Sequence, residues 1–267
     1  MHYSARDHTF ALCAYKENPH LEQTIRSLLN QTIRTNILVS TSTPNDYILG
    51  LCKKYNLELT VNEHPGKAGD DWNHAYDTAG SEIVTLAHQD DIYDPRFAEL
   101  TIYYLNRRRQ SDAIMTFTDY YEIRNGRRVS ANRILNIKRV MNKAFRAPGG
   151  AKSRFVRHRI LSVGDSICCP SASFVKKNAG ESIFDTHYIN SCDYKTWVDL
   201  SNKRGAFVYI PDILMGHRIY EESATTHNLE EGIRKREDAE IMALFWPKPI
   251  ARIINHEYAK SEKSNEL

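Results

Sequence analysis

The fold is decided by the stretch Ile83-Val84-Thr85-Leu86-Ala87-His88-Gln89-Asp90-Asp91, in which an apolar run passes directly into four polar residues. Such a short run is typical of a strand buried on both faces of a parallel sheet. Further strands are predicted at residues 9–15, 37–39 and 57–61, with helical spacing of apolar residues between them. This alternation through residue 110 predicts an α/β fold with a mostly parallel sheet and helices on both faces. Ligands of such sheets bind at the carboxyl ends of the strands, where polar loops should converge.

The second half of the chain continues the mixture of strands and helices. Strands are predicted at residues 113–118, 171–175 and 206–210, and a helix at residues 194–200. The polar tail, residues 228–267, has apolar positions on either side of Pro247-Lys248-Pro249, which predicts two helices separated at the prolines. These helices either pack on their own domain or form a dimer contact.

Composition excludes several classes of protein. The chain has 267 residues, of which 41% are hydrophobic and 26% charged, as in an ordinary globular protein with a sizeable core. No run approaches eighteen consecutive apolar residues, and the N-terminus lacks the order of a signal peptide. Five cysteines without paired CxxC spacing indicate neither a disulfide framework nor a structural zinc site. We therefore expect a cytoplasmic protein.

The charge is distributed unevenly, although 36 basic and 33 acidic residues leave a net charge of only +3. Residues 126–164 contain eleven basic residues and no acidic one, and Ile134, Ile137, Met141 and Phe145 recur there at helical spacing. A basic amphipathic helix can lie on an anionic membrane surface or contact the pyrophosphate of a lipid-linked acceptor. The alternative is that the apolar stripe packs on the core and the charges are solvated. A nucleic-acid-binding protein is a weaker interpretation, because no helix-turn-helix, zinc-finger or aromatic RNA-binding signature accompanies the charge.

The pair Asp90-Asp91 directly follows a buried strand. Two carboxylates at a strand end can hold a hard divalent cation, which neutralises the growing charge of a departing diphosphate. A helix cap is the structural alternative, and for Asp94, which precedes Pro95, we expect the cap. Asp90 is instead expected in the site, because its neighbours are also polar where the strand has just ended.

Several motifs of the first half resemble family 2 glycosyltransferases, which have the GT-A nucleotide-sugar fold. Residues 13–21 stand where that family has a Pro-Thr-Tyr-Asn loop, and residues 27–32 match its Ser-Leu-Leu-Asn-Gln-Thr helix end. Asn73 lies seven residues before Gly80, as in the family. The family's Asp-x-Asp metal motif falls on residues 88–90, with a histidine in place of the first Asp.

Two further motifs lie in the second half. Residues 191–197 resemble the family's Glu-Asp-Tyr-x-x-Trp helix start, with Cys192 in place of the Glu. Residues 217–225 resemble its Tyr-Arg-x-His-x-x-Ser-x-Thr loop, with the His and Tyr exchanged. The resemblance therefore spans about residues 8–225, and the ordered set of motifs makes it specific.

The resemblance implies a role for each matched position. Asp193 stands at the place of the catalytic base, which implies a single displacement with inversion at the anomeric carbon. A divalent metal, Mn²⁺ or Mg²⁺, is implied at Asp90, with His88 and Asp91 as further ligands. The expected donor-binding residues are Ala14, Tyr15, Glu17, Ser40, Thr41, Asp71, Asn73, His88, Gln89 and Arg218.

The expected protein is an inverting hexosyl- or deoxyhexosyltransferase. Residues 1–227 would form the GT-A domain, with a nucleotide-binding half at 1–110, an acceptor half at 111–227 and the helical extension at 228–267. The donor would be UDP- or dTDP-linked, although Ser40 or Thr41 replaces the family's uracil-contacting Asp. The acceptor would be a glycan or a lipid-pyrophosphate-linked glycan in cell-surface polysaccharide or O-antigen synthesis. The enzyme would then work in the cytoplasm, peripherally on the inner face of the plasma membrane.

Some of these residues also have a structural interpretation. Asp193 is suited to cap the following helix, and Tyr15 to fill the core as a buried aromatic. His217 and Arg218 are suited to salt-bridge the sheet or to bind a diphosphate. A catalytically silent nucleotide-sugar-binding module stays open as well.

Overall fold

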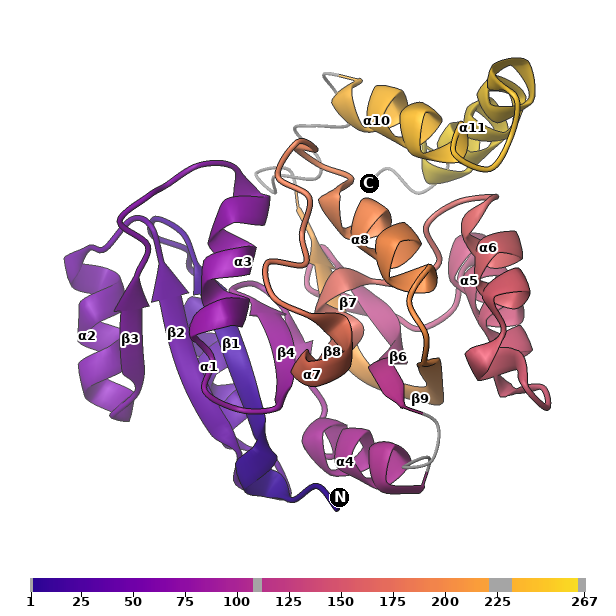
Figure 1. The fold of residues 1–267 in the computed structure, drawn as a ribbon. Helices are drawn as coiled ribbons and strands as arrows, with labels where there is room; N and C mark the ends of the chain where they lie inside the picture. Colours follow the sequence, from indigo (N-terminus) through magenta and orange to yellow (C-terminus); the bar gives the residue numbers. More distant parts are fainter. Residues whose placement is uncertain (1, 108–111, 221–231, 264–267) are drawn as a thin grey trace.

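The computed structural model describes residues 2–107, 112–220 and 232–263 (Figure 1). Within them a nine-stranded sheet has the order β3-β2-β1-β4-β8-β6-β9-β5, and β7 pairs with β6. Four strands of the N-terminal half pair in parallel, and three helices connect them. The strands are β1 His8–Ala14, β2 Asn36–Thr41, β3 Glu58–Val61 and β4 Ile83–His88, and the helices are α1 Leu21–Leu29, α2 Asp46–Tyr55 and α3 Ala68–Thr78.

The second half adds strands of both directions. Strand β8 runs antiparallel between β4 and β6, while β6 and β9 run parallel to each other. Six of the nine described strands therefore point the same way, and the predicted α/β fold with a mostly parallel sheet is confirmed. The elements are β5 Ile92–Tyr93, α4 Phe97–Arg107, β6 Ala113–Arg124, β7 Arg127–Val129, β8 Ala172–Val175, α8 Cys192–Ser201 and β9 Ala206–Ile219.

Helices cover both faces of the sheet, as the sequence predicts (Figure 1). Alternate residues of β1 face opposite sides: Phe10 and Leu12 pack with α1, α2 and α4, whereas Ala11 packs with α3 and α8. Because side chains alternate along a strand, a central strand with two covered faces needs an uninterrupted apolar run. This requirement explains why residues 83–87 pointed to the fold.

The basic segment follows the second of its two interpretations, core packing, over most of its apolar stripe. Helix α5, Arg133–Asn142, buries Ile134 and Leu135, and Phe145 is buried just after it, so most of the expected apolar stripe packs inward. Ile137, predicted on the same face, is 45% exposed instead. A second helix, α6 (Arg154–Leu161), was not predicted, because its sequence carries three arginines and a histidine among four apolar residues. Core packing is therefore the correct interpretation of α5.

The tail forms the two predicted helices, α10 (Ile233–Met242) and α11 (Lys248–Lys263), which begin and end around the prolines. Pro249 is tolerated in the first turn of α11, where backbone N–H groups have no partner within the helix. Ile241, Met242 and Ala251 are buried in the main core, so both helices pack on their own domain. Across the described residues, no helix combines the length and apolarity that crossing a bilayer requires.

Candidate active site

The ends of three neighbouring strands bring the predicted donor loops together. Cys13 of β1 lies opposite Ser40 of β2 and His88 of β4, so the polar loops leave the sheet at one level. The backbone N–H of Tyr15 donates to Oε1 of Gln89 at 2.8 Å, which ties the first loop to the acidic one. The predicted convergence of these loops is confirmed.

The donor-binding candidates of the first two loops differ in exposure. Ser40 and Thr41 are buried at the end of β2, and Ala14 is buried at the end of β1. Tyr15 is 50% exposed, so the alternative that it fills the core is wrong. Glu17 is exposed beside it. An exposed aromatic ring at a strand end is free to stack on a planar base.

The acidic loop is held from both sides. Thr24 of α1 places its hydroxyl 2.8 Å from the carbonyl oxygens of both Gln89 and Asp91. From β9, Arg218 donates through Nε to the carbonyl oxygen of Asp90 at 2.9 Å. Tyr220 donates its hydroxyl to Oδ2 of Asp90, also at 2.9 Å. Residues 221–225 of the same predicted motif lie outside the described residues.

Asp91 is fully buried and joins β4 to β9. Its Oδ1 accepts the backbone N–H of Arg218 at 3.0 Å and lies 3.1 Å from Nδ1 of His217. Burial alone would lower the pKa of His217, but the charges of Asp91 and Asp90 raise it above its ordinary value. His217 thus forms the salt bridge that the structural interpretation expects, whereas Arg218 braces the loop through hydrogen bonds to Asp91, to the carbonyl oxygen of Asp90 and to Gln23.

His88 stacks on Trp72 of α3, with ring centroids 4.9 Å apart and planes inclined by 25°. Its Nε2 is buried and has no partner among the described residues. Burial lowers the pKa of His88 to about 4, so the imidazole is neutral at physiological pH. A neutral ring nitrogen can accept a hydrogen bond or ligate a metal.

The acidic loop fits a cation that is shared with a ligand, rather than a closed protein cage. The described residues contain no group of three His, Cys, Asp or Glu side chains that could hold a metal alone. Burial, followed by the charge of Asp91, raises the pKa of Asp90 to about 6. Oδ2 of Asp91 is buried without a hydrogen-bond partner in the described part of the chain. Mg²⁺ typically binds one or two carboxylates together with substrate phosphates. Asp90 and Asp91 can provide the carboxylates.

The two candidates on α3 already have partners. Asp71 accepts from Oγ of Ser42 at 2.7 Å and from Nδ2 of Asn62 at 2.9 Å. Asn73 exchanges two hydrogen bonds with the backbone of Phe184, at 2.8 and 2.9 Å. Asn73 therefore ties α3 to the segment that leads into α8, a role that its spacing in the sequence did not reveal.

Asp193 lies in the first turn of α8, where its Oδ1 accepts the backbone N–H of Tyr194 at 2.8 Å. The residue at the N-cap position is Ser191, so the capping interpretation of Asp193 is wrong. Burial, together with the charge of Asp165, raises the pKa of Asp193 to about 7. A carboxylate whose pKa lies near the working pH is suited to accept a proton.

Cys168 links the acidic loop to Asp193. Burial raises the pKa of its thiol, and the negative charges of Asp91, Asp165 and Asp193 raise it further. The thiol is therefore within electrostatic reach of both acidic motifs. Sequence reasoning missed Asp165 and Cys168, since neither belongs to a recognisable motif.

Helix α10 holds the segment that precedes Asp193. The carboxylate of Glu237 accepts the backbone N–H groups of Ile189, Asn190 and Ser191 at 2.8, 2.9 and 2.9 Å. Asp238 accepts the hydroxyl of Ser191 at 2.8 Å. Both carboxylates are buried. Figure 1 shows α10 above α8, so the tail is part of the framework of the site.

The comparisons with known proteins agree with this geometry. The chain matches the model of Glycosyl transferase family 2 over residues 9–183, more than half of its length. The chain belongs to this family. No curated protein sequence matches it significantly.

Solved structures with the same fold include TarS and a mannosyltransferase. TarS from S. aureus is 15% identical with a TM-score of 0.61, and the match covers 90% of this chain but only 42% of TarS. TarS 1-349 in complex with UDP-GlcNAc is 14% identical with a TM-score of 0.64, covering 91% and 72% of the two chains. The mannosyltransferase PcManGT from Pyrobaculum calidifontis, in complex with GDP-Man and Mn²⁺, is 13% identical with a TM-score of 0.61, covering 98% and 76%. Identities this low show the GT-A-like fold alone.

The family match covers the strand-end loops of the site but not the segment of Asp193. The match of this family 2 glycosyltransferase includes the strand-end loops and Asp90, and it ends at residue 183. Asp193 and the bracing helix α10 lie beyond it. The role of Asp193 therefore depends on the motif at the start of α8 and on the surroundings of its carboxylate.

Proposed function

We propose that this family 2 glycosyltransferase transfers a hexosyl or deoxyhexosyl group from a nucleoside-diphosphate sugar to an acceptor hydroxyl, with inversion. The observation that carries the proposal is the carboxylate of Asp193, which has a pKa of about 7 and shares the surroundings of Cys168 with the acidic loop. The neighbouring Cys192 packs against Gly69 of α3, the helix that carries Asp71 and Asn73.

The protein binds the nucleotide-sugar donor through its nucleobase and its diphosphate. The exposed ring of Tyr15 is available to stack on the nucleobase. Arg218, held beside the acidic loop, and the neutral imidazole of His88 can donate hydrogen bonds to phosphate oxygens. TarS 1-349 in complex with UDP-GlcNAc and PcManGT with GDP-Man show that proteins of this fold bind such donors. We infer a UDP- or dTDP-linked sugar.

The reaction is a single displacement. The acceptor oxygen bonds to the anomeric carbon while the bond from that carbon to the diphosphate breaks, and the acceptor proton passes to Asp193. Attack opposite the leaving group inverts the anomeric centre and needs no covalent intermediate. A bound Mn²⁺ or Mg²⁺ at Asp90 supplies charge stabilisation for the departing diphosphate. Arg218 places a further positive charge beside the same loop.

The acceptor is a glycan or a lipid-pyrophosphate-linked glycan of cell-surface polysaccharide or O-antigen synthesis, at the cytoplasmic face of the membrane. Support comes from segment 126–164, in which eight of the eleven basic residues are exposed and suit an anionic acceptor or surface. Incubation with a panel of nucleotide sugars and acceptors, read by product mass, identifies the pair.

Asp193→Asn tests the base. We expect donor affinity to be retained and transfer to fall by about 10²–10⁴-fold, the usual contribution of general-base catalysis. Asp199→Asn is the matched control, since Asp199 lies on the same helix and its exposed carboxylate pairs with Lys195. Transfer within a fewfold of wild type in Asp193→Asn would place the base elsewhere.

A silent binding module is the second candidate, favoured by His88 and Cys192 at positions that are acidic in the family. It predicts donor binding without turnover in the wild type. Donor hydrolysis measured with Mn²⁺ separates the two candidates.

A further inference from the structure

Exposed apolar side chains are concentrated in two segments of the described chain. Of thirteen large hydrophobic residues that are exposed there, seven lie within residues 137–163 and 244–253. They are Ile137, Val140, Phe155, Val163, Leu244, Ile250 and Ile253. Where such side chains form one contiguous patch, they mark an interaction surface.

The two segments meet where α6 lies next to the turn between α10 and α11. The guanidinium of Arg159 lies 5.8 Å from the ring of Phe155 and 5.3 Å from the ring of Trp246. Nε1 of Trp246 donates to the carbonyl oxygen of Ser162 at 2.8 Å, immediately before Val163. We call Phe155, Arg159, Val163 and Trp246 the α6–α11 patch. Phe155, at 71%, is the most exposed large hydrophobic residue in the described chain.

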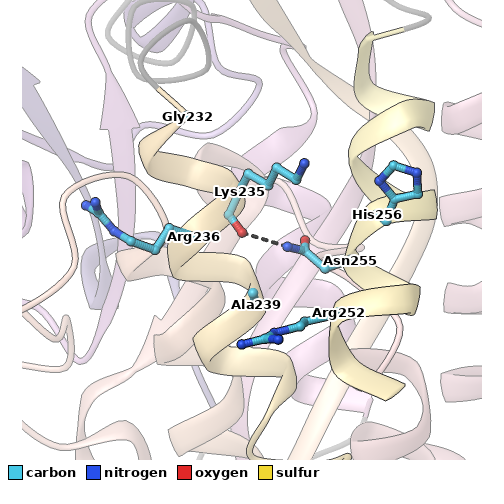
Figure 2. A pocket seen from close by; sticks show the side chains of 7 residues that line it. All are labelled: Gly232, Lys235, Arg236, Ala239, Arg252, Asn255 and His256. Carbon is cyan, nitrogen blue, oxygen red and sulfur yellow. Dashed lines mark hydrogen bonds between the residues drawn. The ribbon is translucent and has the colours of Figure 1, made fainter. Parts of the chain in front are cut away.

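The surroundings of the patch are positively charged. Residues 126–164 and 241–256 contain no Asp or Glu. Within the described chain neither Arg154 nor Arg159 pairs with a carboxylate, and Arg154 donates to the amide oxygen of Asn202 instead. A cavity of about 410 Å³ between α10 and α11 is also lined by basic side chains (Figure 2). It is lined by Gly232, Lys235, Arg236, Ala239, Arg252, Asn255 and His256.

We propose that the α6–α11 patch docks on an anionic membrane surface. Aromatic and aliphatic side chains enter the boundary between headgroups and acyl chains, while surrounding cations bind anionic lipid headgroups. A second copy is a poorer occupant, because a two-fold contact through this patch would set its arginines against each other. A nucleic acid would satisfy the cations and leave the aliphatic side chain of Val163 in water.

Docking at this patch would bring a lipid-linked acceptor to the base. Asp165 follows Val163 by two residues, and its charge acts on Asp193. This consequence for the acceptor rests on the proposed function, whereas membrane binding itself does not. The proposed membrane-binding surface lies on α6 and not on the amphipathic helix predicted from the sequence. That helix, α5, packs most of its apolar side on the core, whereas α6 exposes Phe155 to solvent.

Vesicle sedimentation of the full chain tests the proposal. With phosphatidylcholine vesicles that contain phosphatidylglycerol, we expect partitioning at least about tenfold above that with phosphatidylcholine alone, and a decline at high salt. Arg154→Gln with Arg159→Gln should lower partitioning by about ten- to thirtyfold, and Phe155→Ser by about tenfold.

Matched controls are exposed residues that lie outside the α6–α11 patch. Tyr103→Ser removes a ring of α4 that is 51% exposed, and Arg34→Gln with Lys53→Gln removes two exposed cations. Circular dichroism checks that every variant folds. Equal partitioning into both vesicle types, or losses in the controls as large as in the patch variants, would overturn the proposal.

Two further readouts separate the alternatives. A vesicle-independent dimer in light scattering that Phe155→Ser converts to a monomer would assign the patch to self-association and overturn membrane docking. Donor hydrolysis without vesicles should be unchanged in Phe155→Ser. A wild type that binds anionic vesicles but hydrolyses no nucleotide sugar would leave the docking surface standing and reject the proposed function.

Discussion

The acidic loop and the Asp193 segment are both acidic corners of one site, but they are built in opposite ways. In the acidic loop, the carboxylate of Asp91 contacts the imidazole of His217 and accepts the backbone N–H of Arg218. Asp193 instead lies near a second carboxylate, Asp165, which disfavours its charge. The first corner therefore surrounds its carboxylates with hydrogen-bond donors and a positively charged ring, whereas the second places two carboxylates near each other.

The two corners also differ in what supports them. The acidic loop is fixed by α1, which the family match includes, and by the end of β9, which lies beyond it. The segment before Asp193 is fixed by two carboxylates of α10, about 45 residues further along the chain. Substitutions that affect one corner and spare the other therefore test the comparison.

Asp90→Ala should have the largest effect on donor binding. Removing the motif carboxylate is expected to weaken Mn²⁺-dependent donor affinity by about a hundredfold, because even indirect supports of a metal contribute tenfold or more. His88→Asp should preserve or strengthen metal use, since it restores a hard oxygen ligand. Titration calorimetry with and without EDTA measures both. Full affinity in EDTA together with a tolerant Asp90 would reject the metal at this corner.

Glu237→Ala should affect the other corner. Three N–H groups lose their acceptor, and the buried one, of Ser191, costs about 1–3 kcal/mol when left unsatisfied, so Tm should fall by at least about 2 °C. We also expect kcat to fall by about tenfold while the KM for the donor changes little. Glu240→Ala, on the exposed side of the same helix, is the control, and Glu237→Gln should recover part of both losses. A donor KM that rises as much as kcat falls would show that α10 does not act on the base selectively.

Asp193→Asn should make the protein more stable at alkaline pH. The folded pKa of about 7 lies above the ordinary value of 3.8, so the folded chain binds this proton more tightly than the unfolded chain does. Stability is then complete below about pH 4 and is lost as the pH rises towards 7. Asn carries no charge, so the variant does not lose this stability at high pH. At pH 8 its Tm should exceed that of wild type by about 2–4 °C for each kcal/mol of unfolding free energy regained, and at pH 4 the two Tm values should match. An equal difference at both pH values would contradict a buried, titrating Asp193.

The sequence predicts the acidic loop better than the Asp193 segment, for a physical reason. A strand buried on both faces must be apolar throughout, so residues 83–87 and the polar residues that follow stand out. Glu237 and Asp238 follow Arg234, Lys235 and Arg236, and such a charged run is typical of a solvated helix face. Their burial becomes evident only when the three N–H groups before α8 are seen to need an acceptor. No periodic pattern encodes that partnership.

Helix α6 was missed for a related reason. Arg157 is only 1% exposed, and its guanidinium donates to the carbonyl oxygens of Gly205 and Lys203. A buried arginine breaks the apolar periodicity from which helices are predicted. Asn73 shows the converse, since its spacing was recognised but its hydrogen bonds to Phe184 could be identified only in the structure.

The pH dependence of kcat/KM, measured for wild type and Asp165→Asn, tests most directly that Asp193 is a base tuned by its surroundings. Because the base acts when deprotonated, kcat/KM of the wild type should rise with pH and level off above about pH 7. Asp165→Asn removes a neighbouring negative charge but keeps an oxygen for the N–H of Ile167, so its curve should level off at lower pH. A profile that is flat between about pH 5 and 8, or one that Asp165→Asn leaves in place, would contradict the assignment.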